Sequence, residues 1–111
     1  MTMVEQQLGQ SRPSSTTAES LYSPGASEIA IIKTIYVCNT TTAAAAFRIF
    51  VDDNGTTYDE TTALFFDSNV DANQTVELNT FISMNDSTGN LGIRTDTASA
   101  LTFTAFGAVI T

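Results

Sequence analysis

The densest group of side chains able to hold an ion lies at residues 52–60, where the turn DDNG is followed by Asp59 and Glu60. Calcium prefers carboxylate and amide oxygens of this kind. The calcium loop D-x-[DN]-x-[DN]-G needs its glycine further along than Gly55. We therefore interpret the segment as an acidic turn, with weak calcium binding as the alternative, and predict no metal site.

Catalytic chemistry has few candidate residues. Asp67, Asp71 and Glu77 could supply the paired carboxylates of a glycosidase, but nothing in the sequence brings them together, and tryptophan is absent. Histidine, the commonest general base, is absent too. Cys38 lies in the apolar run 35–38, which favours a small buried side chain over a reactive thiol. The sequence predicts a protein that is not an enzyme and has neither catalytic residues nor a cofactor.

Composition narrows the class of partner. The 111 residues include four basic and twelve acidic side chains, for a formal net charge of −8. Nucleic acid and anionic membranes both require cations, so neither is an expected partner. Only 14% of the residues are charged, and Thr, Ser, Asn and Ala fill the difference. Neither a signal peptide nor an apolar run of membrane-spanning length is apparent. Such a surface suits a soluble protein in a crowded assembly.

The chain divides near residue 18. Residues 1–18 are rich in Gln, Ser and Thr, and Val4 and Leu8 are the apolar anchors of this segment. A segment of this kind buries too little to offset its ordering entropy, so we expect a flexible N-terminal arm. The arm is either a frayed terminus or a segment that orders on a neighbouring subunit. Residues 19–111 are expected to form one folded domain.

The folded domain shows strand patterns separated by turn signals. Asn54-Gly55 is a hairpin signal, and Pro24-Gly25 marks another turn. The pattern predicts an all-β fold, an antiparallel β-sandwich or jelly roll of seven to eight short strands with an extended N-terminal arm. Strands are expected near residues 20–22, 28–38, 47–51, 63–67, 75–78, 91–95 and 98–111. A short return strand at 56–58 would be the eighth, and residues 81–84 are interpreted as a half-buried crossing segment.

Two long strands carry apolar residues on both faces. In the first, alternation groups Ile29, Ile31, Ile35 and Val37, with Lys33 interrupting, against Ile32, Thr34, Tyr36 and Cys38. In the last, it groups Leu101, Phe103, Ala105, Gly107 and Val109 against Thr102, Thr104, Phe106, Ala108 and Ile110. The first of these strands is expected to be covered on both faces, by a second sheet and by a partner subunit or loop.

A set of apolar side chains remains after the core is assigned. A monomer of this size should not expose several of them together, so we expect a homo-oligomer. The predicted contact residues are Val4, Leu8, Ile32, Tyr36, Phe50 and Phe106.

Several segments resemble small β-rich virion structural proteins of tailed bacteriophages. The resemblance is carried by Ser-Leu-Tyr at 20–22, the Pro-Gly turn, I-x-x-I-Y-V-C-N-T at 32–40, TYDETTALFFD at 57–67 and LTFTAFG at 101–107. It implies a head decoration (cement) protein, made in the host cytoplasm and carried on the capsid surface of the virion. Such a protein is usually a homotrimer, and its partner is the major capsid protein.

Two other functions stay open. One is a neck, tail or fibre component of the virion. The other is a carbohydrate-binding module that recognises a glycan through Tyr22, Tyr36 or Tyr58.

Overall fold

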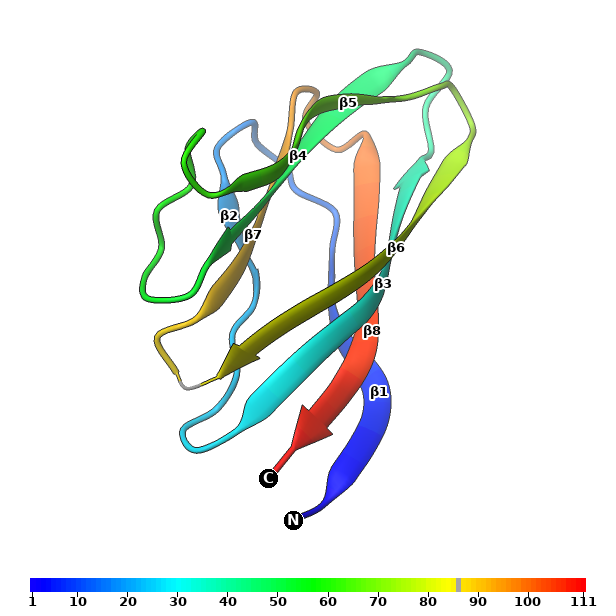
Figure 1. Cartoon of the computed structure of the whole chain (residues 1–111). Coiled ribbons are helices and arrows are strands. Elements are labelled where there is room, and N and C mark those ends of the chain that lie inside the picture. The colour runs from blue at the N-terminus through cyan, green and yellow to red at the C-terminus, as the bar shows by residue number, and fades with distance from the viewer. Residues whose placement is uncertain (86) are drawn as a thin grey trace.

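The computed structural model describes residues 1–85 and 87–111, and the described residues form strands and no helix (Figure 1). None of the described segments is therefore a helix that could cross a membrane. The strands are β1 (Met3–Ser11), β2 (Glu19–Tyr22), β3 (Ile29–Asn39), β4 (Ala45–Asp52), β5 (Ala63–Val70), β6 (Thr75–Asn85), β7 (Asn90–Thr95) and β8 (Leu101–Ile110). The short strand considered at residues 56–58 is instead part of a loop. The strand expected at 75–78 and the crossing segment expected at 81–84 form one continuous strand.

The strands form two antiparallel four-stranded sheets. The first sheet has the order β1-β8-β3-β6 and the second has the order β2-β7-β4-β5. The pairs β4–β5, β3–β6, β2–β7 and β1–β8 form one long antiparallel ribbon that alternates between the two sheets. A ribbon rolled up in this way is the eight-stranded jelly roll, so the structure selects the jelly roll from the two predicted sandwich architectures.

The N-terminal segment differs from the expected flexible arm. Residues 3–11 form β1, which pairs with β8 along most of its length. Leu8 packs against the core, and Arg12 Nε donates a hydrogen bond to the carbonyl of Ser99 at 2.9 Å. The side-chain composition of residues 3–11 does not predict a strand, because an edge strand is held mainly by backbone hydrogen bonds to its neighbour.

The core lies between the two sheets. Its largest side chains include Phe47 and Ile49 from β4, Ile35 from β3 and Phe103 from β8, all fully buried. Phe47 and Phe103 meet edge to face across the sandwich, with ring centroids 6.1 Å apart. The prediction of Phe106 as a contact residue implies that Leu101, Phe103 and Ala105 lie on the inner face of the last strand, and all three are buried.

A row of extra residues bends the first sheet. Lys33 of β3 has no counterpart on β8, where Ile32 and Thr34 pair with the adjacent Gly107 and Phe106. Leu8 is the extra residue of β1 against β8, and on β6 Thr80 and Phe81 together face Lys33. We call these four residues the bulge line. A bulge increases the local bend and twist of a sheet. When a strand contains one extra residue, the side chains beyond that residue also point to the opposite face from the one that simple alternation predicts.

The bulge line corrects the predicted faces of β3. Ala30 and Ile32 point inward together with Ile35, whereas Ile29 and Ile31 point outward. Ile32 is fully buried and cannot be a contact residue.

The chain itself covers part of the outward side of the second sheet. The loop between β4 and β5 folds back over the sheet, and Tyr58 packs against Phe50 with ring centroids 5.8 Å apart. The Tyr58 hydroxyl donates to Asn90 Oδ1 at 2.7 Å, and its ring lies directly over Gly92. Phe50 is only 1% exposed, so it too is unavailable to a partner.

Candidate interaction surface

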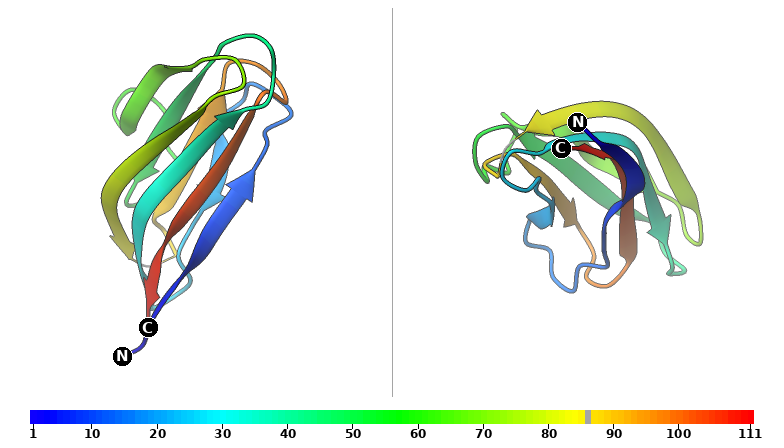
Figure 2. Two further views of the ribbon diagram at one scale, coloured as in Figure 1. Left: turned by 90° about the vertical axis from the view of Figure 1, so that its right-hand side faces the viewer. Right: turned by 90° about the horizontal axis from the view of Figure 1, so that it is seen from below.

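The outward side of the first sheet has no such cover. We call it the open face; Figure 2 (left) looks onto it, with β6, β3, β8 and β1 side by side in front of the second sheet. Three aromatic side chains stand on it, Tyr36 of β3, Phe106 of β8 and Phe81 of β6, and Ile29 is exposed near one end. Phe81 is 77% exposed, far more than an aromatic side chain in a packed interior. The open face is therefore the strongest candidate for contact with another molecule.

Tyr36 and Phe106 form a fixed aromatic pair. Their rings meet edge to face with centroids 6.0 Å apart and planes at 83°. The Tyr36 hydroxyl donates to Glu77 Oε2 at 2.8 Å, and this bond raises the pKa of Tyr36. Phe106 and Glu77 hold the Tyr36 ring in place, so the ring loses little conformational freedom when a partner binds. This favours contact with a partner.

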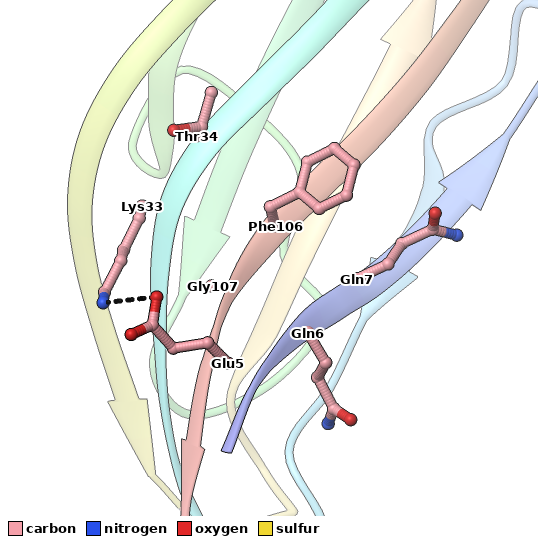
Figure 3. Close-up of a pocket in the computed structure, with 7 residues that line it drawn as sticks. All are labelled: Glu5, Gln6, Gln7, Lys33, Thr34, Phe106 and Gly107. Atoms are coloured by element: carbon pink, nitrogen blue, oxygen red, sulfur yellow. Dashed lines mark ion pairs between the residues drawn. The ribbon is translucent and has the colours of Figure 1, made fainter. Parts of the chain in front are cut away.

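A hollow of about 440 Å³ lies beside this pair, where the bulge line crosses β1, β8 and β3. Gly107 contributes no side chain to it, and Phe106 and Gln7 form part of its wall (Figure 3). The Lys33 Nζ atom lies 3.3 Å from Glu5 Oε2, so an ion pair spans the intervening β8. Both side chains are largely exposed, so this pair adds little stability and its main effect is on the shape of the hollow.

Charge is scarce on the open face. Among the outward residues that the structure describes, Glu5, Lys33 and Glu77 are the charged ones, and each has a partner within this face. One base against two acids leaves a net charge of −1, whereas the whole chain carries −8. Most of the negative charge therefore lies on other surfaces.

The structure divides the six predicted contact residues. Tyr36 and Phe106 come together on the open face, and Val4 is exposed on β1. Leu8, Ile32 and Phe50 are used inside the molecule, Leu8 as a partly buried neighbour of the core. Cys38, predicted to be buried, is half-buried on the open face.

Two contact candidates were missed by the sequence reasoning, Ile29 and Phe81. Lys33 interrupts the apolar alternation of β3. This break was the signal that Ile29 and Ile35 lie on opposite faces of the strand. Phe81 alternates in step with the polar residues Glu77, Asn79 and Ser83 along β6, so it lies on the same outward face. This alternation was the signal that Phe81 is exposed.

The acidic cluster shapes its loop. Asp52 accepts hydrogen bonds from the backbone N–H groups of Asn54 at 3.0 Å and Thr57 at 2.9 Å, and these bonds lower its pKa. Asp59 accepts from the side chain and the backbone N–H of Thr61, which lowers its pKa in the same way. Within residues 1–85 and 87–111, no three His, Cys, Asp or Glu side chains lie close enough to share a metal ion. The arrangement observed is that of carboxylates bound to their own turn.

A third carboxylate is held by a cation. Arg48 of β4 donates to both carboxylate oxygens of Asp67, at 2.7 and 3.1 Å, and its guanidinium lies 3.8 Å from the centre of the Phe66 ring. The side-chain bond from Arg48 lowers the pKa of Asp67. These groups hold the bent strand β5 against β4 on the second sheet.

Acid is expected to weaken the fold. The pKa values of Asp52, Asp59 and Asp67 in the folded protein lie below the ordinary aspartate value. The three carboxylates therefore stabilise the fold fully above about pH 4, and this stabilisation is lost as the pH falls through the lowered pKa values. Thermal melts between about pH 6 and about pH 2 should show a falling midpoint, and Asp59→Asn should reduce that fall. Asp53→Asn is the matched control. A midpoint equally acid-sensitive in Asp59→Asn and in the control would contradict the assignment.

The strand order places the chain among jelly-roll proteins. Solved structures of the same fold come from virus particles. A chain of the T13 viral particle of infectious bursal disease virus matches with a TM-score of 0.56 and 11% identity, over 97% of this chain. A chain of the Gx strain of the same virus matches with a TM-score of 0.52 and 14% identity, over 96%. This chain spans 29% of the length of each of these two proteins, so the match covers one part of each of them. No protein-family model and no curated protein sequence matches it. At these identities the likeness establishes the fold.

Proposed function

We propose that the chain is a structural component of a virus particle that binds neighbouring subunits through the open face. The observation that carries this proposal is the jelly-roll strand order, matched over 97% of the chain by a virus-particle protein. The uncovered aromatic pair Tyr36–Phe106 on a face of low charge supports it, because exposed apolar patches mark protein contacts.

The more specific form of the proposal is a head decoration protein that binds the major capsid protein on the capsid surface. The low density of charge and the uncovered face support a role in a crowded lattice. A tailed-bacteriophage origin has the sequence resemblance as its support, since the compared structures come from infectious bursal disease virus. A neck, tail or fibre position differs in partner, and labelling the chain on intact particles separates the two.

Glycan binding is less favoured. Of the three tyrosines proposed as platforms, Tyr58 is packed on Phe50 and Gly92, and Tyr22 packs against the core. Burial, with a smaller effect of Glu28, raises the pKa of Tyr22. Tyr36 alone of the three faces outward with an exposed ring, and one ring is a poor platform for a sugar chain.

The open face is tested by polar substitution of its aromatic pair. Tyr36→Ser with Phe106→Ser should reduce binding to particles that lack the chain by at least about tenfold, because central aromatic residues carry most of the energy of an interface. Binding is measured by co-sedimentation of purified chain with the particles. Phe66→Ser, an exposed aromatic on the second sheet, is the matched control. Full binding by the double variant, with a melting midpoint close to the wild type, would exclude the open face.

A further inference from the structure

We infer that the open face binds a second copy of this chain, with Phe81 of each copy seated in the hollow of the other. This inference rests on the proposed function, because it names a second copy of this chain, in place of the major capsid protein, as the neighbouring subunit that the open face binds. It is carried by three properties of the face: shape, charge and area.

Shape is the first argument. Phe81 projects from β6 at one edge of the open face, and the hollow lies on the β1-β8-β3 side of the same face. Both lie on the bulge line, since Lys33 faces Phe81 on one side and lines the hollow on the other. The hollow, which has a volume of about 440 Å³ and opens at the surface, has room for an aromatic ring, and Phe106 and Gly107 supply apolar lining.

The projection and the hollow complement each other in a symmetric pair. A two-fold axis parallel to the strands and between β6 and β8 would bring Phe81 of each copy over the hollow of the other. Each contact is then made twice, as in an isologous dimer. It also leaves the strands of the two packed sheets nearly aligned, as in β-sandwiches.

Charge is the second argument. Two copies that each carry −8 repel one another, and contact is least costly where the charge is lowest. The open face carries −1, with its ion pair and its tyrosine–glutamate bond satisfied internally. On the outward side of the second sheet, the exposed apolar side chains Leu64 and Phe66 lie on the edge strand β5, and the Arg48 guanidinium covers the Phe66 ring. The Tyr58 loop covers part of this side, and Arg94 Nε there binds the carbonyl of Thr16 at 2.9 Å.

Area is the third argument. With the axis midway between β6 and β8, the two copies overlap over β8, β3 and β6. Three strands about 4.8 Å apart and about ten residues long, at about 3.3 Å per residue, present about 480 Å². The pair therefore buries about 950 Å² in total, which is typical of weak and reversible contacts, so the expected product is a weak, reversible dimer.

Sedimentation equilibrium of the full chain over a concentration series tests the inference. The wild type should show a monomer–dimer equilibrium, and Phe81→Asp should weaken it by at least about tenfold. Leu64→Asp is the matched control, because Leu64 is 53% exposed on β5 and the substitution adds the same charge. Both side chains are exposed, so both variants should keep the melting midpoint of the wild type. A monomeric wild type, or equal effects of the two variants, would overturn the inference.

Cross-linking tests the reciprocal seating. In a Cys38→Ser background, chains with Phe81→Cys and chains with Gln7→Cys should form a mixed disulfide dimer when combined under air. Each alone should cross-link at least about tenfold less, because Phe81 faces the hollow of the partner and Gln7 lines that hollow. Cross-linking of Phe81→Cys alone as efficient as the mixture would contradict the arrangement.

The outcomes separate this inference from the proposed function. A chain that is monomeric yet joins particles through its aromatic pair overturns the dimer and leaves the virion role intact. A chain that dimerises through Phe81 yet binds no particle overturns the virion role and leaves the dimer.

Discussion

Gly107→Ala is expected to destabilise the fold by about 3 kcal/mol or more, out of the roughly 5–15 kcal/mol that keeps a domain folded. Gly107 lies opposite Ile32 where the bulge line brings β3 and β8 together. A Cβ atom at this position would overlap the carbonyl oxygen of Ile31 and lie 2.9 Å from its carbonyl carbon and 3.0 Å from Ile32 Cα. These are backbone atoms of a central strand and cannot rotate away, so the sheet itself would have to shift.

Urea unfolding followed by far-ultraviolet circular dichroism measures this loss. Gly89→Ala is the control, because its Cβ would meet the Met84 Cβ at 3.3 Å and the Asn85 carbonyl oxygen at 3.4 Å, which small adjustments relieve. We expect the control to cost about 1 kcal/mol or less. Similar unfolding free energies for the two variants would show that β3 and β8 are not in close contact at the bulge line.

Phe103→Ala is the second large effect, with an expected loss of about 3–5 kcal/mol in the free energy of unfolding. Phe103 is fully buried on the inner side of β8, and its ring meets Phe47 of the opposite sheet. Truncation leaves a cavity between two sheets that are each held by their own hydrogen bonds, so neither can collapse fully to fill it.

Phe106→Ala, three residues along the same strand, is the matched control for Phe103→Ala. Phe106 points outward and has Tyr36 as its aromatic neighbour, so we expect a loss of at most about 1.5 kcal/mol. Chemical denaturation of both variants measures the difference. Equal losses would mean that Phe106 is part of the core, and the open face would no longer be a candidate for binding.

Local patterns determined the class of fold and part of the site. The alternation of residues 101–109 predicted the inner face of β8 correctly, because β8 contains no extra residue and its period of two is unbroken. Tyr36 and Phe106 were recognised as outward aromatic residues for the same reason, since each lies in an unbroken stretch of its strand. The all-β class, the turns that connect the strands and the scarcity of charge were also readable from residue types alone.

The tertiary structure decided the rest, and the physical reason is that the remaining features depend on neighbours distant in the sequence. A bulge is defined by the strand opposite, so Lys33 exchanged the faces of β3 in a way that β3 alone did not specify. Segment 3–11 became a strand because the edge of β8 offered it hydrogen bonds, despite a polar composition typical of an arm. Strand periodicity specified two apolar faces, and only the packing of the whole chain determined which one stays open.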